Sequence, residues 1–472
     1  MSARRPGYRP LGQCFPRLAD ELAALARQAR PTDLLSLNLP LAELPWPAFP
    51  AFIPGPDSMA WQRPEDAWLA LGAACTVESA GPGRFTALHA AWQGLAEGWR
   101  IGGESGCPGP LAHLGFAFYD SSPADGPLPN ARLRVPSLLL RKQAERHSLT
   151  LSCPAQAAPQ AMAGWEALWQ ILEQALWRQP MPETAPRLHR PPAPLPDRAF
   201  LARTQAALAA IARGDLDKVV LSRRIAFHAD AELSPAAVYA ALGRQQPAST
   251  VFAVGHRAGA FLGATPERLL SLRNGRLETE ALAGTGWGAA EAPLGSEKNR
   301  REHGWVAEAI QQTLAPLCAE LRMEPAEVLH LPLARQNTGL SHLRTPFRGC
   351  TAAGIGLFDL AARLHPTPAV GGWPAAPARD WLQAHGEERP LWYSGGLGWI
   401  DPAGNGTLAV PLRCADLRGP HAELQAGAGI VAGSSPEQEL AETEAKLAAM
   451  LDALHAGAAP AAAAPDRRTG TE

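Results

Sequence analysis

At 472 residues, the chain is long enough to bury a large hydrophobic core, in one large domain or in two to three smaller ones. Hydrophobic residues make up 46% of it and charged residues 19%, which is typical of a soluble globular protein. The formal net charge of −2 gives no electrostatic reason to expect nucleic acid or an anionic membrane as a partner. No stretch approaches the roughly 18 consecutive apolar residues of a membrane span.

The N-terminal sequence and the cysteines predict a cytoplasmic protein. MSARRPGYRPLGQCF carries basic residues without the apolar stretch that follows them in a secretory signal. The seven cysteines are scattered and include no CxxC pair, which argues against both a disulfide framework and a zinc site. A reducing compartment suits such a set.

Two segments of biased composition divide the chain. Proline density over residues 179–197 excludes regular structure there, and residues 456–472 are predicted to form a disordered tail. Before the first break, residues 136–153 have the pattern of a hairpin and residues 163–179 that of an amphipathic helix. This N-terminal part carries no recognisable chemical site.

Regular elements follow more densely after residue 200. The pattern predicts a helix over 200–215, a strand over 218–229, strands joined by glycine and Asn-Gly turns over 251–282, a helix over 303–318 and a hairpin over 391–417. A last helix begins after Ser435, which can cap it, with Pro436 in its first turn. Antiparallel hairpins with long helices between them predict an α+β layered fold.

Two titratable residues stand at the ends of predicted strands. Lys218 opens the apolar strand KVVL, where its ammonium either reaches solvent or is desolvated, and desolvation favours the neutral amine of a general base. Glu267 follows a strand in GATPER, where an apolar setting could hold it protonated as a general acid. For each residue alone, the pattern favours a solvent-exposed side chain.

Three glutamates could form a cluster. Glu302 lies in the first turn of the helix predicted from SEKNRREH, where a carboxylate complements the helix dipole without any further role. Glu439, Glu442 and Lys446 are spaced i, i+3 and i+7, so they share one face of the last helix. If they met, the three carboxylates would suit magnesium, which takes one or two carboxylates plus waters and a ligand anion. Spacing alone does not show that Glu302 meets the other two.

Glycine-rich segments and an arginine add possible anion contacts. LAGTG at 282–286, YSGGLG at 393–398 and AGAGI at 426–430 place glycines beside strands, where backbone N–H groups can bind an anion. Arg413, in the predicted strand TLAVPLRCADL, would require a carboxylate partner if it pointed inward.

Two histidines are less specific. For His342 and His365 the pattern favours a core or surface position over a role as ligand or base.

Together, a lysine, an acid, a carboxylate cluster, an arginine and glycine-lined backbone suit an enzyme that acts on a small polycarboxylate with a divalent metal. The co-occurrence carries this hypothesis, because no single group is specific.

Nine sequence blocks occur in a recognisable order. They are KVVLSR, FLGATPERL, ALAGT, SEKNRREH, SHLRTPF, LHPTPAVGGWP, YSGGLGW, LRCADL and AGAGIVAGSSPEQELAETEAKL. Over about residues 196–455 this order resembles chorismate-utilising enzymes, and within that family isochorismate synthases most of all. The resemblance implies one large α/β (α+β) chorismate-binding fold, with two antiparallel-rich β-sheets packed as a sandwich and helices outside. Residues 1–195 would complete the sheets, 196–455 would form the chorismate-binding catalytic region, and 456–472 the tail.

The resemblance also implies roles for residues of this chain, with chorismate as substrate and Mg²⁺ as cofactor. The family's base falls on Lys218 and its acid on Glu267. Magnesium would be held by Glu302 and Glu442, with Glu439 nearby, through water. The implied substrate contacts are Tyr393, Arg413, Gly427 and Lys446 for the two carboxylates, the backbone of Gly284 and Thr285 for the ring carboxylate, and His342 lining the site.

Within the family, the residues favour water as the nucleophile at C2, with loss of the C4 hydroxyl. Ammonia-using relatives such as anthranilate synthase component I generally lack a lysine at the position of Lys218, and aminodeoxychorismate synthases often carry one where this chain has Ala283. No glutaminase subunit is therefore expected, and monomers are common among such relatives. Asn299 stands where aspartate is common, but this departure removes no catalytic group.

Two other functions remain as alternatives. Salicylate synthases, which go on to eliminate pyruvate, share nearly all of these residues, so motifs separate them poorly. An inactive homologue that acts as a binding protein would have lost Lys218, Glu267 or a metal glutamate, and none is lost.

Overall fold

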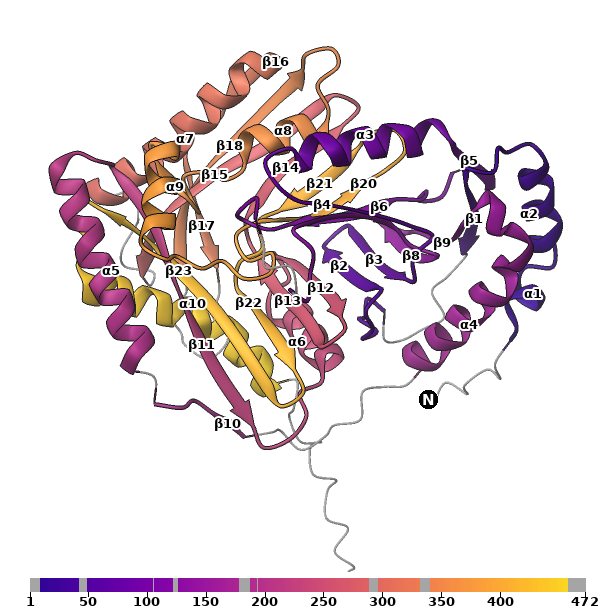
Figure 1. Ribbon diagram of the computed structural model, residues 1–472, viewed down its shortest axis with the longest axis horizontal. Coiled ribbons are helices and arrows are strands. Elements are labelled where there is room, and N and C mark those ends of the chain that lie inside the picture. Colours follow the sequence, from indigo (N-terminus) through magenta and orange to yellow (C-terminus); the bar gives the residue numbers. More distant parts are fainter. Residues whose placement is uncertain are drawn as a thin grey trace, which may run out of the picture.

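The computed structural model describes residues 9–41, 49–104, 106–121, 126–177, 187–192, 194–287, 296–331 and 340–456. Two β-sheets form the centre of the molecule, and helices lie around them (Figure 1). The α+β sandwich predicted from the sequence is confirmed.

Runs of strands, separated by helices, follow one another along the described residues. Up to residue 177 they are α1 Leu11–Cys14, α2 Leu18–Arg27, β1 Leu34–Leu41, β2 Ser58–Arg63, β3 Asp66–Leu71, β4 Cys75–Ser79, α3 Arg84–Glu97, β5 Trp99–Gly103, β6 Ala112–Phe116, β7 Ala131–Val135, β8 Leu138–Gln143, β9 Arg146–Pro154 and α4 Ala158–Trp177. From residue 188 to 314 they are β10 Leu188–His189, α5 Pro194–Arg213, β11 Lys218–Ala229, α6 Pro235–Gln245, β12 Thr250–His256, β13 Gly259–Thr265, β14 Arg268–Arg273, β15 Arg276–Trp287 and α7 Glu297–Leu314. The last are β16 Cys318–Met323, β17 Glu327–Leu331, β18 Leu340–Thr351, α8 Leu357–Leu364, β19 Gly372–Trp373, α9 Ala375–Ala384, β20 Gly396–Ile400, β21 Gly406–Ala409, β22 Cys414–Arg418, β23 His421–Val431 and α10 Pro436–Ala456.

Strands from both parts of the chain share each sheet. Among the described residues, the first sheet runs β10-β11-β23-β22-β13-β12-β2-β3-β8-β9-β1-β5, with β19 also paired to β11. The second runs β16-β18-β15-β14-β21-β20-β6-β7-β4, with β17 also paired to β18. β12 pairs antiparallel with β2 and β20 with β6, so strands that precede residue 195 continue both sheets without a break.

Alternating side chains along the strands divide the core into layers. On β12, Phe252 and Val254 belong to an aromatic-rich core that also contains Trp399 of the second sheet, so this core lies between the sheets. Val251 and Ala253 belong to the core on the opposite face. Because successive side chains of a strand point to opposite faces, β12 contributes residues to both of these core layers.

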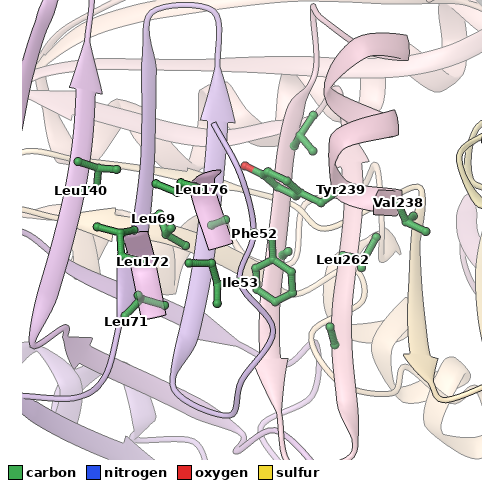
Figure 2. Packing of buried hydrophobic residues seen from close by; sticks show 14 of the residues in the cluster. Phe52, Ile53, Leu69, Leu71, Leu140, Leu172, Leu176, Val238, Tyr239 and Leu262 are labelled. Atoms are coloured by element: carbon green, nitrogen blue, oxygen red, sulfur yellow. The ribbon is translucent and has the colours of Figure 1, made fainter. Parts of the chain in front are cut away.

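The opposite face of the first sheet is covered by helices, as Figure 2 shows for part of it. Leu172 and Leu176 of α4 lie in one buried cluster with Leu69 of β3, and Tyr239 of α6 joins it beside Leu262 of β13. Helices α5 and α10 pack against β11 and β23 at the other end of this sheet, and α7 packs against β15 of the second sheet. Helices α7 and α10, with strands β11, β15 and β23, contribute residues to the wall of the site described below.

Most local predictions agree with the structure, but the proline-rich segment does not. The hairpin over 136–153 is β8 and β9, and the strand over 218–229 is β11. The prediction that residues 179–197 exclude regular structure is wrong where it meets β10 and the start of α5. The first turn of a helix tolerates proline, because the backbone N–H groups there have no partner within the helix. Residues 178–186, and the tail from 457, lie outside the described residues.

The hairpin predicted over 391–417 is also wrong in its second half. β20 and β21 do pair around residues 401–405, but β22 pairs with β13 and β23 in the other sheet. The chain crosses from one sheet to the other between β21 and β22. Arg413 lies in that crossing with φ of 49°, and not within a strand as predicted.

Tyr239→Phe is expected to leave the free energy of unfolding unchanged or to raise it by about 1 kcal/mol. The Tyr239 hydroxyl is buried and has no hydrogen-bond partner among the described residues, so phenylalanine removes a desolvated polar group and keeps the ring. Leu172→Ala in the same core is the control, with an expected loss of about 2–5 kcal/mol. Denaturant unfolding measures both changes. A loss above about 1 kcal/mol for Tyr239→Phe would contradict the expectation.

Candidate active site

A cavity lies where strands of the two sheets approach helix α10. It contains about 740 Å³ of empty space, part of which is open to solvent. The structure brings most of the predicted site residues to its wall: Glu267, Gly284, Thr285, Glu302, His342, Tyr393, Arg413, Gly427, Glu442 and Lys446. Lys218 and Glu439 do not line the cavity and instead lie behind its wall. Such a concave site with convergent polar groups is the usual form of a small-molecule site.

Lys218 is buried at the start of β11. Its strand is flanked by β19 and β23, so the side chain is 1% exposed, and the solvent-exposed position that its pattern favours is wrong. Its Nζ lies 2.9 Å from Oε1 of Glu302, which is in the second turn of α7 and not in the first turn as predicted. Gly429 makes room for the pair, because a Cβ there would lie 2.5 Å from Oε1 of Glu302. Lys218 is thus a buried amine directly behind the cavity wall.

Glu267 lies in the short connection between β13 and β14. It is buried, so the solvated loop position that its pattern favours is also wrong. Burial, and then the charge of Glu280, raise the pKa of the Glu267 carboxyl to about 8, although Lys218 and Lys446 act in the opposite direction. A carboxyl with this pKa keeps its proton near neutral pH and can donate it.

Three carboxylates and three lysines pair beside the cavity. Nζ of Lys218 lies 2.9 Å from Glu302, Nζ of Lys298 lies 2.7 Å from Glu439, and Nζ of Lys446 lies 2.6 Å from Glu442. Burial and the neighbouring charge of Glu442 raise the pKa of Glu439. Burial also acts to raise the pKa of Glu442, but Lys446 outweighs it, and the net shift is downward. The two glutamates on this face of α10 therefore have pKa values shifted in opposite directions.

The carboxylates fit a hard cation. Glu302 and Glu442 line the cavity, and Glu439 is close enough to Glu442 to respond to its charge. All three glutamates act on Lys298, so the structure already accommodates a positive charge among them. Within the described ranges, no three histidine, cysteine or acidic side chains are gathered as a ready metal site. Magnesium does not need three, because one or two carboxylates, waters and ligand oxygens complete its shell.

A chain of hydrogen bonds links Arg413 to Glu442. Nη2 of Arg413 lies 3.3 Å from Nε2 of His342, and Nδ1 of His342 lies 3.4 Å from Oγ1 of Thr285. The Thr285 hydroxyl donates to Oε1 of Glu442 over 3.1 Å. Burial and Arg413 lower the pKa of His342 to about 3, so its neutral ring can accept from Arg413 and donate to Thr285. His342 is therefore buried in the cavity wall, and not in the core or at the surface as its pattern alone favours.

Gly427 exposes its backbone to the cavity. A Cβ there would lie 2.8 Å from the Leu221 carbonyl and 3.2 Å from the Tyr393 hydroxyl, so only glycine fits without displacing a neighbour. Nζ of Lys446 donates to the Gly427 carbonyl over 2.9 Å. Tyr393 is buried beside it, and burial raises the pKa of its hydroxyl, which stays a neutral donor.

Gly284 shapes the opposite wall on β15. A bulge interrupts the pairing of β15 with β18 between Ala283 and Thr285, and Gly284 has φ of 74°, in the left-handed region. Nδ2 of Asn299 donates to the Thr285 carbonyl over 3.1 Å, which ties the bulge to α7. The bulge turns this backbone toward the cavity.

Sequence reasoning does not identify every polar residue at the site. Arg389 lines the cavity, Glu387 is buried behind it, and Lys298 pairs with Glu439. For Glu387 and Arg389, the signal in the sequence is the charged run GEERP just before the aromatic pair WY, because charges beside a buried segment need partners. His365 is a core histidine, as its pattern favours, and its Nε2 donates to the Ser394 carbonyl over 2.9 Å.

Comparison with known proteins identifies the family. The sequence profile of the family described as "Chorismate binding enzyme" matches residues 21–455. This chain belongs to the chorismate-binding enzymes. It is 34% identical over 418 residues to the salicylate biosynthesis isochorismate synthase of Pseudomonas aeruginosa, with 84% of each chain covered. It is 37% identical over 260 residues to the isochorismate synthase EntC of Escherichia coli, covering 52% of this chain and 64% of that one.

Solved structures of other chorismate-binding enzymes have the same fold. The menaquinone-specific isochorismate synthase MenF from Escherichia coli aligns with a TM-score of 0.71 at 26% identity, over 93% of this chain and 99% of that one. Anthranilate synthase component I from Streptococcus pneumoniae aligns with a TM-score of 0.65 at 19% identity, over 82% and 92%, and shows the fold alone. The predicted family is confirmed.

None of the helices in the described part of the chain is long and apolar enough to cross a membrane.

Glu267→Gln is expected to stabilise the metal-free protein, and by more at pH 9 than at pH 5. The folded pKa of about 8 is above the ordinary value of 4.5, so the wild-type protein loses stability as the pH rises through this interval. Glutamine does not titrate. The gain at pH 9 has an upper limit of about 5 kcal/mol, because one pKa unit corresponds to about 1.4 kcal/mol. Thermal unfolding of both proteins across this pH range tests the expectation, and a difference that does not change with pH contradicts it.

Proposed function

We propose that this chain isomerises chorismate to isochorismate with Mg²⁺, as water adds at C2 of the ring and the C4 hydroxyl leaves. The observation that carries the proposal is the pair of Lys218 and Glu267. One is a buried amine, the other is a buried carboxyl that keeps its proton near neutral pH, and Lys218 is close enough to influence the pKa of Glu267. Membership in the chorismate-binding family, and relatives named as isochorismate synthases, support the substrate and the reaction.

The two residues act as base and acid in one displacement. Lys218, as the neutral amine, takes a proton from the water molecule that attacks C2. The ring double bonds shift, the C4–O bond breaks, and Glu267 gives its proton to the departing hydroxyl. One water enters and one leaves, so the reaction consumes no co-reactant. Proton transfer through solvent then restores the neutral amine and the protonated carboxyl.

The carboxylates beside the cavity are proposed to hold the metal. Glu302 and Glu442 line the wall and would bind Mg²⁺ directly, and Glu439 would contribute through a water. Bound Mg²⁺ withdraws charge from the ring carboxylate of the substrate and orients it. Lys298 and Lys446 balance the charges of Glu439 and Glu442 and keep these side chains in place.

The remaining wall residues are proposed to bind the carboxylates of chorismate. Tyr393, Arg413, Lys446 and the backbone at Gly427 line the cavity and suit the carboxylate of the enolpyruvyl side chain. The backbone of Gly284 and Thr285 suits the ring carboxylate, and His342 contacts both Thr285 and Arg413.

Water remains the proposed nucleophile because the base is present. Ala283 has no side chain that could attack the ring, and Lys218, a buried amine beside Glu302 of the cavity wall, is the proposed base for water. A cytoplasmic monomer without a glutaminase subunit stays a prediction. The alternative function is salicylate synthesis, in which isochorismate loses pyruvate in the same site. The name of the Pseudomonas aeruginosa relative places that enzyme in salicylate biosynthesis as an isochorismate synthase, which favours isomerisation as the reaction here.

Lys218→Ala and Glu267→Gln are each expected to reduce chorismate turnover by at least about a hundredfold, because each removes a proton-transfer group. Product chromatography after incubation with chorismate and Mg²⁺ measures this. Isochorismate alone supports the proposal, salicylate with pyruvate supports the alternative, and anthranilate formed with ammonium overturns both.

The matched control for this pair is Glu278→Gln. Glu278 lies on β15, is 48% exposed and pairs with Arg268, so its loss is expected to leave turnover unchanged. Wild-type turnover in both Lys218→Ala and Glu267→Gln contradicts the assigned roles.

Glu442→Gln is expected to weaken Mg²⁺ binding roughly tenfold or more, because it removes a charged ligand from the cavity wall. Calorimetric titration of Mg²⁺ and turnover against Mg²⁺ concentration after chelation measure the effect. Glu444→Gln is the control, since Glu444 lies on the same helix but pairs with Arg190 and Arg223. Equal metal affinity in the two variants would show that Glu442 is not a ligand.

A further inference from the structure

Tyr393 is held between two residues in an unfavourable backbone conformation. Leu391 has φ of 55° and Ser394 has φ of 52°, in the left-handed region that side chains other than glycine seldom adopt. Arg413, which also lines the cavity, has φ of 49°. Such a conformation is unfavourable for a residue with a side chain, so the surroundings must hold it in place.

The guanidinium of Arg389 contacts this turn directly. Its Nη1 donates to Oγ of Ser394 over 2.8 Å, and its Nη2 donates to the Val220 carbonyl of β11 over 2.7 Å. It also lies over the ring of Tyr393, 5.6 Å from the centroid. Arg389 lines the cavity, and its Nε donates to Glu387, so each of its three nitrogens has an acceptor in the protein. These contacts fix the side chain within the cavity wall.

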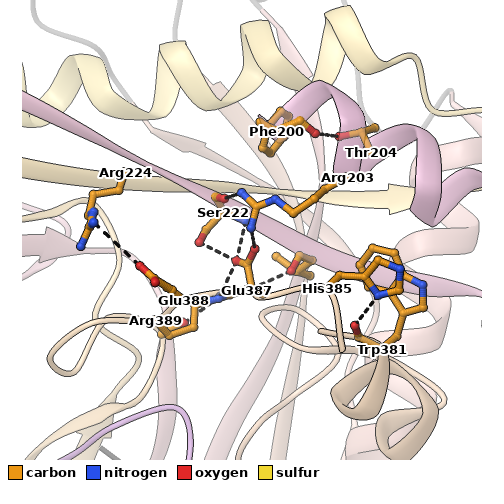
Figure 3. A network of polar contacts seen from close by, with 12 residues as sticks. Phe200, Arg203, Thr204, Ser222, Arg224, Trp381, His385, Glu387, Glu388 and Arg389 are labelled. Carbon is orange, nitrogen blue, oxygen red and sulfur yellow. Dashed lines mark hydrogen bonds and ion pairs between the residues drawn. The ribbon is translucent and has the colours of Figure 1, made fainter. Parts of the chain in front are cut away.

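The carboxylate of Glu387 holds the guanidinium in that position (Figure 3). Its side chain is fully buried, and Oε1 accepts from Nε of Arg389 over 2.9 Å. The same oxygen accepts from the backbone N–H and the hydroxyl of Ser222, over 2.8 and 2.6 Å, and Oε2 accepts from Nη1 of Arg203 over 2.6 Å. Ser222 pairs with Gly427 in the register of β11 and β23. The network therefore connects the Tyr393 turn to the strand opposite Gly427.

A further contact extends the network toward Arg413. The backbone N–H of Ser394 donates to the Pro411 carbonyl over 2.9 Å, and Pro411 precedes Arg413 by two residues. His365 donates to the Ser394 carbonyl from the other side. Ser394 thus links both left-handed turns of the cavity wall.

We propose that Glu387 and Arg389 form a positioning clamp for the subsite that binds the side-chain carboxylate of the substrate. The clamp holds Ser394 in its left-handed conformation and thereby places the Tyr393 hydroxyl and the Arg413 guanidinium beside Gly427. Arg389 acts through Tyr393 and does not contact the substrate. The inference rests on the function proposed above, because it concerns how that site binds its substrate.

Arg389→Lys tests the clamp, because lysine keeps the charge but cannot reproduce the three forked hydrogen bonds. We expect kcat/KM for chorismate to fall by roughly tenfold to a hundredfold, since a small misplacement of a binding group has effects of this size. The double variant with Tyr393→Phe is expected to be no worse than the weaker single variant, because both changes disable the same contact. Multiplying effects would overturn the proposal.

Two further variants distinguish loss of the clamp from misfolding of the protein. Ser394→Ala removes only the hydroxyl that Arg389 binds, and it is expected to lower kcat/KM in the same direction while the thermal unfolding temperature stays near that of the wild type. Arg224→Gln is the control, because Arg224 is half exposed, pairs loosely with Glu388 at 3.8 Å and does not contact the turn. Unchanged kcat/KM in both Arg389→Lys and Ser394→Ala would overturn the clamp.

Hydrogen exchange separates the clamp from the proposed function, because it requires no substrate. Faster exchange of the backbone amides of residues 393–395 in Arg389→Lys, but not in Arg224→Gln, supports the clamp even if the wild-type protein does not convert chorismate. Unchanged exchange in Arg389→Lys overturns it. Absence of wild-type turnover would instead count against the function alone.

Discussion

The site depends on one buried contact between Lys218 and Glu302. Lys218 begins a strand of the first sheet, and Glu302 lies on α7, which packs on β15 of the second. Their contact of 2.9 Å therefore connects a strand of the first sheet to a helix that packs on the second. A buried polar group without a partner is strongly unfavourable, so the contact ties α7 to β11. The proposed base and a proposed metal ligand are held at contact distance by the same interaction.

Surroundings, not residue type, separate the roles of the glutamates. Burial and a second carboxylate raise the pKa of Glu267 to about 8, so it keeps its proton. Glu442 is also buried, but it receives Lys446 and the hydroxyl of Thr285, and its pKa is lowered. One cavity thus contains two carboxyl groups with opposed pKa shifts. Opposed pKa shifts of this kind are what acid–base chemistry near neutral pH requires.

The cavity wall around Tyr393 and Arg413 is built from irregular backbone. Tyr393 and Arg413 lie in turns next to the crossings between sheets, where strand pairing does not define the conformation. Side chains replace that pairing: Arg389 and His365 hold Ser394, and His342 accepts from Arg413. Loops fixed by buried polar contacts can place donors that regular strands would direct elsewhere.

The sequence by itself determined the elements that carry the site and, through the order of its motifs, the family. Alternation over 218–229 and the capped helix after Ser435 rest on local periodicity, which the amino acids specify directly. Only the tertiary structure decided that Lys218 and Glu267 are buried, because burial depends on which distant segments flank them. It also decided the place of Arg413 and the role of Arg389, since a crossing between sheets and a network that joins residues more than 160 positions apart leave no periodic signal.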